Sequence, residues 1–210
     1  MIFSGERRDR MSYVVREFKY CPQCSAKLTT APIEGKVRKT CPVCNYIHWG
    51  EYSVGVGGVL LQGERGLLVQ RAYNPGKGRW TIPGGYVEQD EKIEDAIVRE
   101  FLEETGIRTE PVSVLAVKDR PIDVPGVKHD IYIVFLLNYL EGELNPDPRE
   151  VSQAGFFTPE ECKGLNVAPL SLHLLTKALE FKKLGTQKPG FVRVDGIDII
   201  GALSELYTLP

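Results

Sequence analysis

The sequence lacks the features that would place it in a membrane, in a secretory pathway or on nucleic acid. No apolar run approaches the roughly 20 residues needed to cross a bilayer, and residues 131–137 suffice only for a buried strand. The first residues, MIFSGERRDR, have no apolar signal-peptide core, so we expect a cytoplasmic protein with no membrane partner. The formal net charge of −2 supplies no general attraction to nucleic acid or to anionic lipid. Internal repeats and low-complexity tracts are also absent.

What the chain does have is enough apolar material for one medium domain and a small module, since 42% of its 210 residues are hydrophobic. We divide it into an N-terminal tail at 1–19, a cysteine module at 20–49, a main domain at 50–185 and a C-terminal extension at 186–210. Whether Met11 is an alternative start is left open. The extension holds short apolar segments and should pack on the main domain or on a partner chain.

Cysteine is scarce, with five residues, yet four of them form two C-x2-C pairs separated by sixteen residues. The pairs are Cys21 with Cys24 and Cys41 with Cys44. This spacing predicts a structural four-cysteine zinc site, in which the metal replaces the core that so short a segment cannot build. Disulfides and an iron centre are the alternatives. The fifth, Cys162, is interpreted as a lone thiol near a helix start.

The remaining residues of the cysteine module are interpreted as structural. His48 is not needed as a ligand because four cysteines complete the coordination shell, and we expect it to pack with Trp49 at the junction with the main domain. The cations of the module lack the interleaved aromatic residues of a nucleic-acid stacking surface, so we interpret them as solvated charge. They are Lys27, Lys36, Arg38 and Lys39.

A helix is predicted in mid-chain, after a glycine-containing loop at Pro83-Gly84-Gly85. Its apolar residues recur at helical spacing, Asp90 is the expected N-cap, and Gly106 is a natural stop. The apolar positions are Ile93, Ala96, Ile97 and Phe101.

Three glutamates are unusually placed on this helix. At about 100° per residue, Glu100 and Glu104 lie inside the apolar stripe, and Glu103 lies beside Ala96. Clustered carboxylates in an apolar setting repel one another unless a cation neutralises them, and hard oxygen ligands suit Mg²⁺ or Mn²⁺. Arg99, four residues before Glu103, can orient that carboxylate. An ordinary charged helix with a solvated face is the alternative interpretation.

This stretch resembles the Nudix box, G-x5-E-x7-R-E-U-x-E-E-x-G-U, where U is a bulky apolar residue. Nine residues match without a gap: Gly85, Glu91, Arg99, Glu100, Phe101, Glu103, Glu104, Gly106 and Ile107. The chain is therefore identified as a member of the Nudix hydrolases, in the branch with an N-terminal zinc ribbon. The resemblance implies an α/β/α sandwich with a mixed sheet, preceded by the ribbon. It also implies a structural or dimer-forming ribbon, and hence a homodimer.

The resemblance further implies Mg²⁺-dependent hydrolysis of a nucleoside diphosphate linked to another moiety. Glu100, Glu103 and Glu104 would hold the metal, with the Gly84 carbonyl assisting and one glutamate or a loop acid acting as base. Gly85, Glu91 and Gly106 would support the box. Glu150, just before a predicted strand, is either a further acid of the site or a surface residue.

The substrate must be inferred from residues outside the box. Nudix enzymes acting on ADP-ribose often carry a proline about fifteen residues after the box glycine, and Pro121 stands at that offset from Gly106. The Ser-Gln-Pro-Trp-type motif of NADH diphosphatases and the coenzyme A motif are absent. ADP-ribose is therefore the leading substrate, followed by FAD and nucleotide sugars, and a non-catalytic nucleotide regulator is the alternative from another class. Candidate substrate contacts, each equally explained as structural, are Arg71, Tyr73, Arg79, Arg120, His129 and Tyr132.

Overall fold

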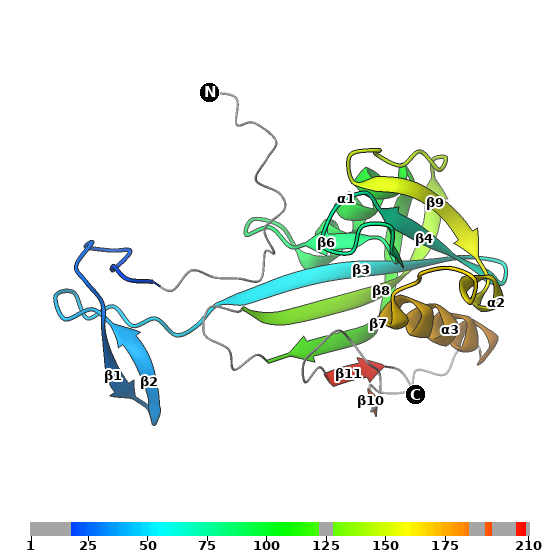
Figure 1. Ribbon diagram of the computed structural model, residues 1–210. Coiled ribbons are helices and arrows are strands. Elements are labelled where there is room, and N and C mark those ends of the chain that lie inside the picture. The colour runs from blue at the N-terminus through cyan, green and yellow to red at the C-terminus, as the bar shows by residue number, and fades with distance from the viewer. Residues whose placement is uncertain (1–17, 122–127, 185–191, 195–204, 209–210) are drawn as a thin grey trace.

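The computed structural model describes residues 18–121, 128–184, 192–194 and 205–208. It contains a small two-stranded module and a larger α/β domain (Figure 1). The strands are β1 (Thr29–Ile33), β2 (Lys36–Thr40), β3 (Tyr52–Gln62), β4 (Arg65–Arg71), β5 (Trp80–Thr81), β6 (Gly84–Tyr86), β7 (Arg108–Arg120), β8 (His129–Glu141), β9 (Val151–Phe157), β10 (Val192–Val194) and β11 (Glu205–Thr208). The helices are α1 (Ile93–Thr105), α2 (Pro159–Cys162) and α3 (Pro169–Leu184). In this described part of the chain, no helix is both long and apolar enough to cross a membrane.

The N-terminal module is an antiparallel hairpin of β1 and β2 placed between two similar turns, one at each cysteine pair. In each turn the residue four after the first cysteine donates its N–H to that cysteine's carbonyl, from Ser25 to Cys21 and from Asn45 to Cys41. Ser25 and Asn45 both have φ near +60°, a conformation that Asn tolerates better than Ser. Figure 1 shows the hairpin standing away from the larger sheet, to which the chain returns through β3.

The larger sheet has the order β10-β11-β7-β8-β3-β4-β5 among the described residues, with β6 added to β3 and β9 to β4. Strands β3 and β8 run parallel over Tyr52–Leu60, whereas the other pairs are antiparallel, so the sheet is mixed. This confirms the mixed α/β fold that the resemblance implied. The C-terminal extension contributes β11, which pairs with β7 from Ala116 to Asp119.

Side chains alternate across β3 and supply two cores, one on each face of the sheet. Val56 and Leu60 face α1 and pack with its Ile97 and Phe101. Val59, between them in sequence, packs instead with the α3 residues of the second core, which include Leu174, Leu175 and Ala178. The two helices therefore cover opposite faces of the sheet, and the box helix is held against β3, β6 and β7.

Two local predictions around the box were wrong. Pro83-Gly84-Gly85 was expected to be a loop, but Gly84 and Gly85 belong to β6 and pair with Gly57 and Val56 of β3. Asp90 was expected to cap the helix, but the N-cap is Lys92, which makes no side-chain cap hydrogen bond. Glu91 instead accepts from the Glu88 N–H and from Arg99, and so ties the preceding loop to the helix. Gly106 does end α1, in the left-handed conformation.

Candidate active site

The three box glutamates of helix α1 are buried to different extents. Glu104 is 9% exposed, the Glu100 side chain 14% and the Glu103 side chain 55%. Burial of Glu100 and Glu104 follows from their position inside the apolar stripe, as predicted. Glu103, expected beside the fully buried Ala96, lies at the solvent edge of the same cluster instead.

Arg99 is the centre of the ion-pair network around the box. Its guanidinium donates to both carboxylate oxygens of Glu91, at 2.7 and 3.0 Å, and also to Glu100 at 2.9 Å and Glu103 at 3.2 Å. A further bond, of 3.1 Å, reaches the carbonyl of Tyr86 in β6. The planar guanidinium thus joins the start of the helix, the strand before it and two of the predicted metal-binding acids. Arg99 does contact Glu103, as predicted, and this is one of the several contacts that its guanidinium makes.

The two glycines of β6 allow the helix to approach the sheet. A Cβ atom on Gly85 would lie 2.3 Å from the Glu100 carboxyl carbon, and one on Gly84 would lie 2.1 Å from the carbonyl oxygen of Val56. The Gly84 N–H donates to Glu104 Oε2 at 2.9 Å. Gly84 is therefore in contact with the acid cluster through its N–H, and the predicted ligand role of its carbonyl stays a prediction.

The buried acids carry strongly perturbed pKa values. Burial raises the pKa of Glu104 to about 8, against the hydrogen bond from Gly84, and the nearby carboxylates of Glu100 and Glu150 raise it further. Burial also raises the pKa of Glu100, which the Arg99 guanidinium counteracts. By contrast, hydrogen bonds from Arg99 and then from the Glu88 N–H lower the pKa of Glu91 to about 2. The cluster is thus an excess of negative charge that a cation would relieve.

The end of β4 and the start of β9 border this cluster. Arg71 lies with its guanidinium 5.1 Å from the centre of the Tyr73 ring, and the Ala72 N–H donates to the Glu150 carbonyl. Arg71 and Glu150 both act on the pKa of Glu104, which places them in its electrostatic neighbourhood. Arg79 joins the same region because its carbonyl accepts from the Arg71 N–H. Arg71 and Glu150 are thus close enough to act on Glu104, and Arg79 is joined to Arg71 through the backbone.

Two further predicted substrate residues, Arg120 and Pro121, lie at the end of β7 and just after it. Arg120 is 3.8 Å from the buried carboxylate of Asp130, and Pro121 is exposed. Residues 122–127 of the loop that Pro121 begins lie outside the described residues. Contact of Arg120 and Pro121 with the substrate therefore stays a prediction.

Near Arg120 lies a polar group that the sequence analysis did not single out, made of Lys118, Asp130 and Ser53. Lys118 binds Asp130 at 2.8 Å, and both side chains are nearly buried, at 12% and 10% exposed. Ser53 also donates to Asp130, at 3.1 Å. Charged residues at alternate positions of otherwise apolar strands were the only sequence signal for this group.

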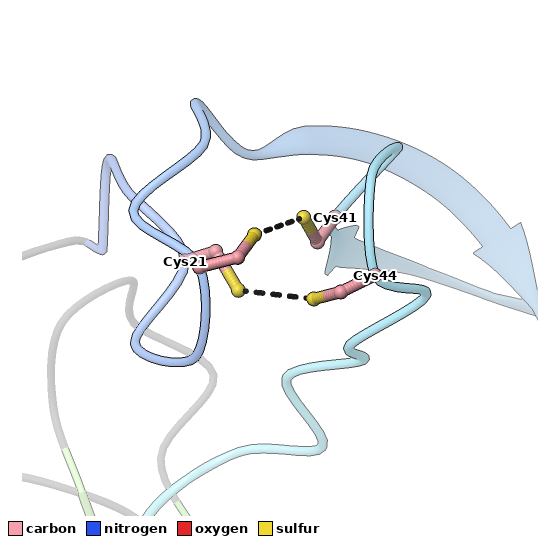
Figure 2. Close-up of side chains that lie close together, drawn as sticks. Cys21, Cys41 and Cys44 are labelled. Atoms are coloured by element: carbon pink, nitrogen blue, oxygen red, sulfur yellow. Dashed lines mark hydrogen bonds between the residues drawn. The ribbon is translucent and has the colours of Figure 1, made fainter.

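The four cysteines converge as predicted. Their sulfur atoms all lie within 4.8 Å of one another, with Cys21 and Cys44 3.5 Å apart and Cys24 and Cys41 3.4 Å apart (Figure 2). Thiolates bound tetrahedrally at about 2.3 Å from zinc would be roughly 3.8 Å apart, so the set fits that ion. All are free thiols, and the Cys44 backbone N–H is the main cause that lowers the pKa of Cys41 to about 6. In the described residues no other group of three or more His, Cys, Asp or Glu side chains brings its ligand atoms together in this way, so the three box glutamates do not form such a group in this structure. His48 packs on Phe18.

The remaining predictions about single residues have mixed outcomes. Trp49 packs within the module rather than at a domain junction, because its ring and its carbonyl are both engaged by Arg38. Cys162 is buried, and burial raises its pKa. It ends α2 rather than starting it.

A buried carboxylate cluster at a sheet–helix junction, oriented by an arginine, is typical of a cation-dependent site that acts on phosphates. The comparisons with known proteins agree. Residues 51–176 match the family described as the NUDIX domain, and the chain belongs to that family. Membership of the Nudix family implies a divalent cation.

Individual relatives resemble different parts of the chain. An ADP-ribose pyrophosphatase of Methanocaldococcus jannaschii is 40% identical over 105 residues, which cover 50% of this chain and 61% of that protein. The NAD-capped RNA hydrolase NudC of Stutzerimonas stutzeri is 25% identical over 175 residues, 83% of this chain and 60% of that protein. A solved NUDIX hydrolase from Nitrosomonas europaea superposes with a TM-score of 0.68 at 28% identity, covering 80% of this chain and 94% of that one. The chain thus spans about three fifths of the length of these two curated relatives.

Proposed function

We propose that this protein is an ADP-ribose diphosphatase that releases AMP and ribose 5-phosphate. The observation that supports it most is the 40% identity to the Methanocaldococcus jannaschii ADP-ribose pyrophosphatase. Pro121, at the offset common in enzymes acting on ADP-ribose, supports it from the sequence. Water would attack one phosphorus, the bridging P–O bond would break, and a carboxylate would take the proton from water.

The residues of the box fit Mg²⁺ or Mn²⁺, because Glu100, Glu103 and Glu104 offer hard oxygen donors and burial raises the pKa values of Glu100 and Glu104. When bound, the cation lowers the pKa of its water and offsets charge on the phosphates. Arg99 positions Glu100 and Glu103, and the Gly84 N–H fixes Glu104. Arg71, Arg79, Arg120, Pro121 and Glu150 would contact the substrate, and the cysteine module would hold one structural zinc and support a homodimer.

A second candidate is a diphosphatase of NAD(H) type. The match to NudC favours it, because that match covers 175 residues and so extends beyond the NUDIX region at 51–176. Absence of the Ser-Gln-Pro-Trp-type motif stands against it. FAD and nucleotide sugars follow. A non-catalytic regulator is disfavoured because the box acids are complete.

A substrate panel tests the assignment directly. With Mg²⁺ present, the zinc-loaded protein is given ADP-ribose, FAD, NADH and UDP-glucose, and AMP or UMP release is measured by chromatography. We expect the highest kcat/KM for ADP-ribose, with AMP and ribose 5-phosphate formed in equal amounts. A higher kcat/KM for NADH or FAD would replace the ADP-ribose assignment with that substrate.

Pro121→Ala tests the role of the loop. Proline has a fixed φ, so alanine should loosen the loop without touching the box. KM for ADP-ribose should rise several-fold while kcat changes little, the pattern of lost ground-state binding. FAD, whose second half is larger, should be affected less. Equal losses for all substrates would show that Pro121 is a structural turn only.

A further inference from the structure

Tyr132 of β8 lies against a gap in the side-chain layer made by two glycines of β3. A Cβ on Gly55 would be 2.8 Å from Cδ2 of its ring, and a Cβ on Gly57 would be 2.2 Å from its hydroxyl oxygen. On its other side the Lys118 ammonium lies 5.5 Å from the ring centre. The absence of side chains at positions 55 and 57 therefore determines where this phenol can lie.

Tyr132 is half-buried, and its hydroxyl makes no hydrogen bond within the described residues; it is not one of the buried polar atoms that lack a partner there, so it is open to solvent. Tyr139, exposed on the same strand, does have a protein partner, because its hydroxyl donates to the Gly142 carbonyl at 2.9 Å. A hydroxyl that is open to solvent and has no protein partner can donate to a ligand oxygen in place of water.

The backbone connects this hydroxyl to the box acids in two steps. Gly57, over which the hydroxyl lies, pairs with Gly84 in the register of β3 and β6. Neighbouring strands are about 4.8 Å apart, and the Gly84 N–H holds Glu104 at 2.9 Å. In agreement, burial and then the carboxylates of Glu104, Asp130 and Glu100 raise the pKa of Tyr132. The phenol therefore keeps its proton and remains a donor at working pH.

We propose that the Tyr132 hydroxyl, held over Gly55 and Gly57, donates a hydrogen bond to a non-bridging phosphate oxygen of the substrate. This rests on the proposed diphosphatase function, and it concerns the part that all the candidate substrates share, the diphosphate. Lys118, paired with Asp130, packs against the other side of the ring and helps to hold it in place. Because the contact is to the phosphates, Tyr132 acts on every diphosphate substrate alike, unlike the loop at Pro121.

Tyr132→Phe tests this, with Tyr139→Phe as the matched control, since it removes a hydroxyl from the same strand at an exposed position. We expect kcat/KM to fall by about 10-fold for every diphosphate that the wild type cleaves, as for loss of a hydrogen bond to a charged group. The melting temperature of Tyr132→Phe should stay unchanged or rise, because no protein partner loses a bond. The control should keep wild-type kcat/KM.

Binding of methylenediphosphonate with Mg²⁺, measured by calorimetry, separates this proposal from the substrate assignment. Its affinity should fall by about 10-fold in Tyr132→Phe even if the wild type prefers NADH or cleaves no member of the panel. Unchanged kcat/KM and unchanged analogue affinity would overturn the proposal. So would a lower melting temperature with unchanged analogue affinity, which is the result for a structural hydroxyl.

Discussion

At the scale of single residues, the chemistry depends on a carboxylate that the fold keeps away from water. Glu104 is buried between α1 and β6 and accepts one hydrogen bond from the described residues, from the Gly84 N–H. A buried carboxylate with a pKa of about 8 is mostly protonated at neutral pH, whereas a bound cation would favour its ionised form. Glu104 therefore couples cation binding to the release of a proton.

Glu104→Gln keeps the shape of the side chain and removes its charge. The fold should persist, while kcat should fall by a factor on the order of 10² or more because a cation ligand is lost. The rate of AMP release at saturating Mg²⁺ checks this, with circular dichroism as the control for folding. Near-normal turnover would exclude a metal-binding role for Glu104.

The same residue predicts how stability depends on pH in protein dialysed free of Mg²⁺. Its folded pKa of about 8 lies above the model-peptide value of 4.5, so the folded state binds the proton more tightly than the unfolded state. The stabilising contribution is complete below pH 4.5 and is lost as pH rises through about 8, by an amount on the order of a few kcal/mol. Unfolding by urea at a series of pH values should show this slope, and Glu104→Gln should flatten it. An identical slope in the variant would assign the effect to other groups.

Arg99 is the second residue on which the site depends. Arg99→Lys keeps the charge but loses the planar fork that reaches Glu91, Glu100, Glu103 and the Tyr86 carbonyl together. We expect kcat to fall by about 10-fold or more and the Mg²⁺ concentration for half-maximal activity to rise. The control is Arg108→Lys, whose pair with Glu141 is exposed at 60% and 66% and contributes little. If Arg99→Lys and Arg108→Lys changed kcat and the Mg²⁺ requirement equally, the positive charge of Arg99 alone would explain its contribution.

At the scale of elements, the cysteine module and the box helix are stabilised by different means. The module buries only a few residues around Cys21, Leu28 and Cys41, too few for a core of its own. Helix α1, in contrast, buries Ala96, Ile97 and Phe101 completely against the sheet. A metal should therefore matter for the module and much less for the helix.

Elemental analysis of the purified protein should give about one zinc per chain. Cys24→Ser should remove that zinc and make the module susceptible to proteolysis, with catalysis weakened but retained because the box lies in another element. Limited proteolysis and metal content measure the two effects. Recovery of metal-free protein with Cys21, Cys24, Cys41 and Cys44 in disulfides would contradict the zinc site.

At the scale of the whole molecule, the C-terminal extension completes the sheet. Strand β11 covers one edge of β7, and β10 pairs with β11. An uncovered edge strand presents unpaired N–H and C=O groups to other chains. The extension is therefore expected to protect the sheet as well as to add to its stability.

Truncation after Leu184 removes both strands and tests this role. The melting temperature should fall by several degrees, and light scattering should detect larger assemblies than the homodimer expected of the full chain. The box acids are untouched, so the soluble fraction should keep catalytic activity. An unchanged melting temperature and mass would mean that β10 and β11 contribute nothing to the sheet.

The sequence alone was enough to predict the box, the cysteine pairs and most elements, because each of these depends on residues close together in the chain. Helical spacing placed Glu100 and Glu104 on the apolar face, and Gly106 ended the helix as expected. The four cysteines were recognised because two tight turns need only local residues.

Other features were decided by contacts between segments distant in the sequence. Pairing with β3 made a strand of Gly84 and Gly85, and the Arg99–Glu91 pair replaced the expected cap at Asp90. Sheet register alone brought Arg71 and Glu150 beside the acids, and placed Tyr132 over Gly55 and Gly57. Local periodicity cannot specify such placements, because a strand's face is set by its own residues but its neighbours are set by the packing of the whole sheet.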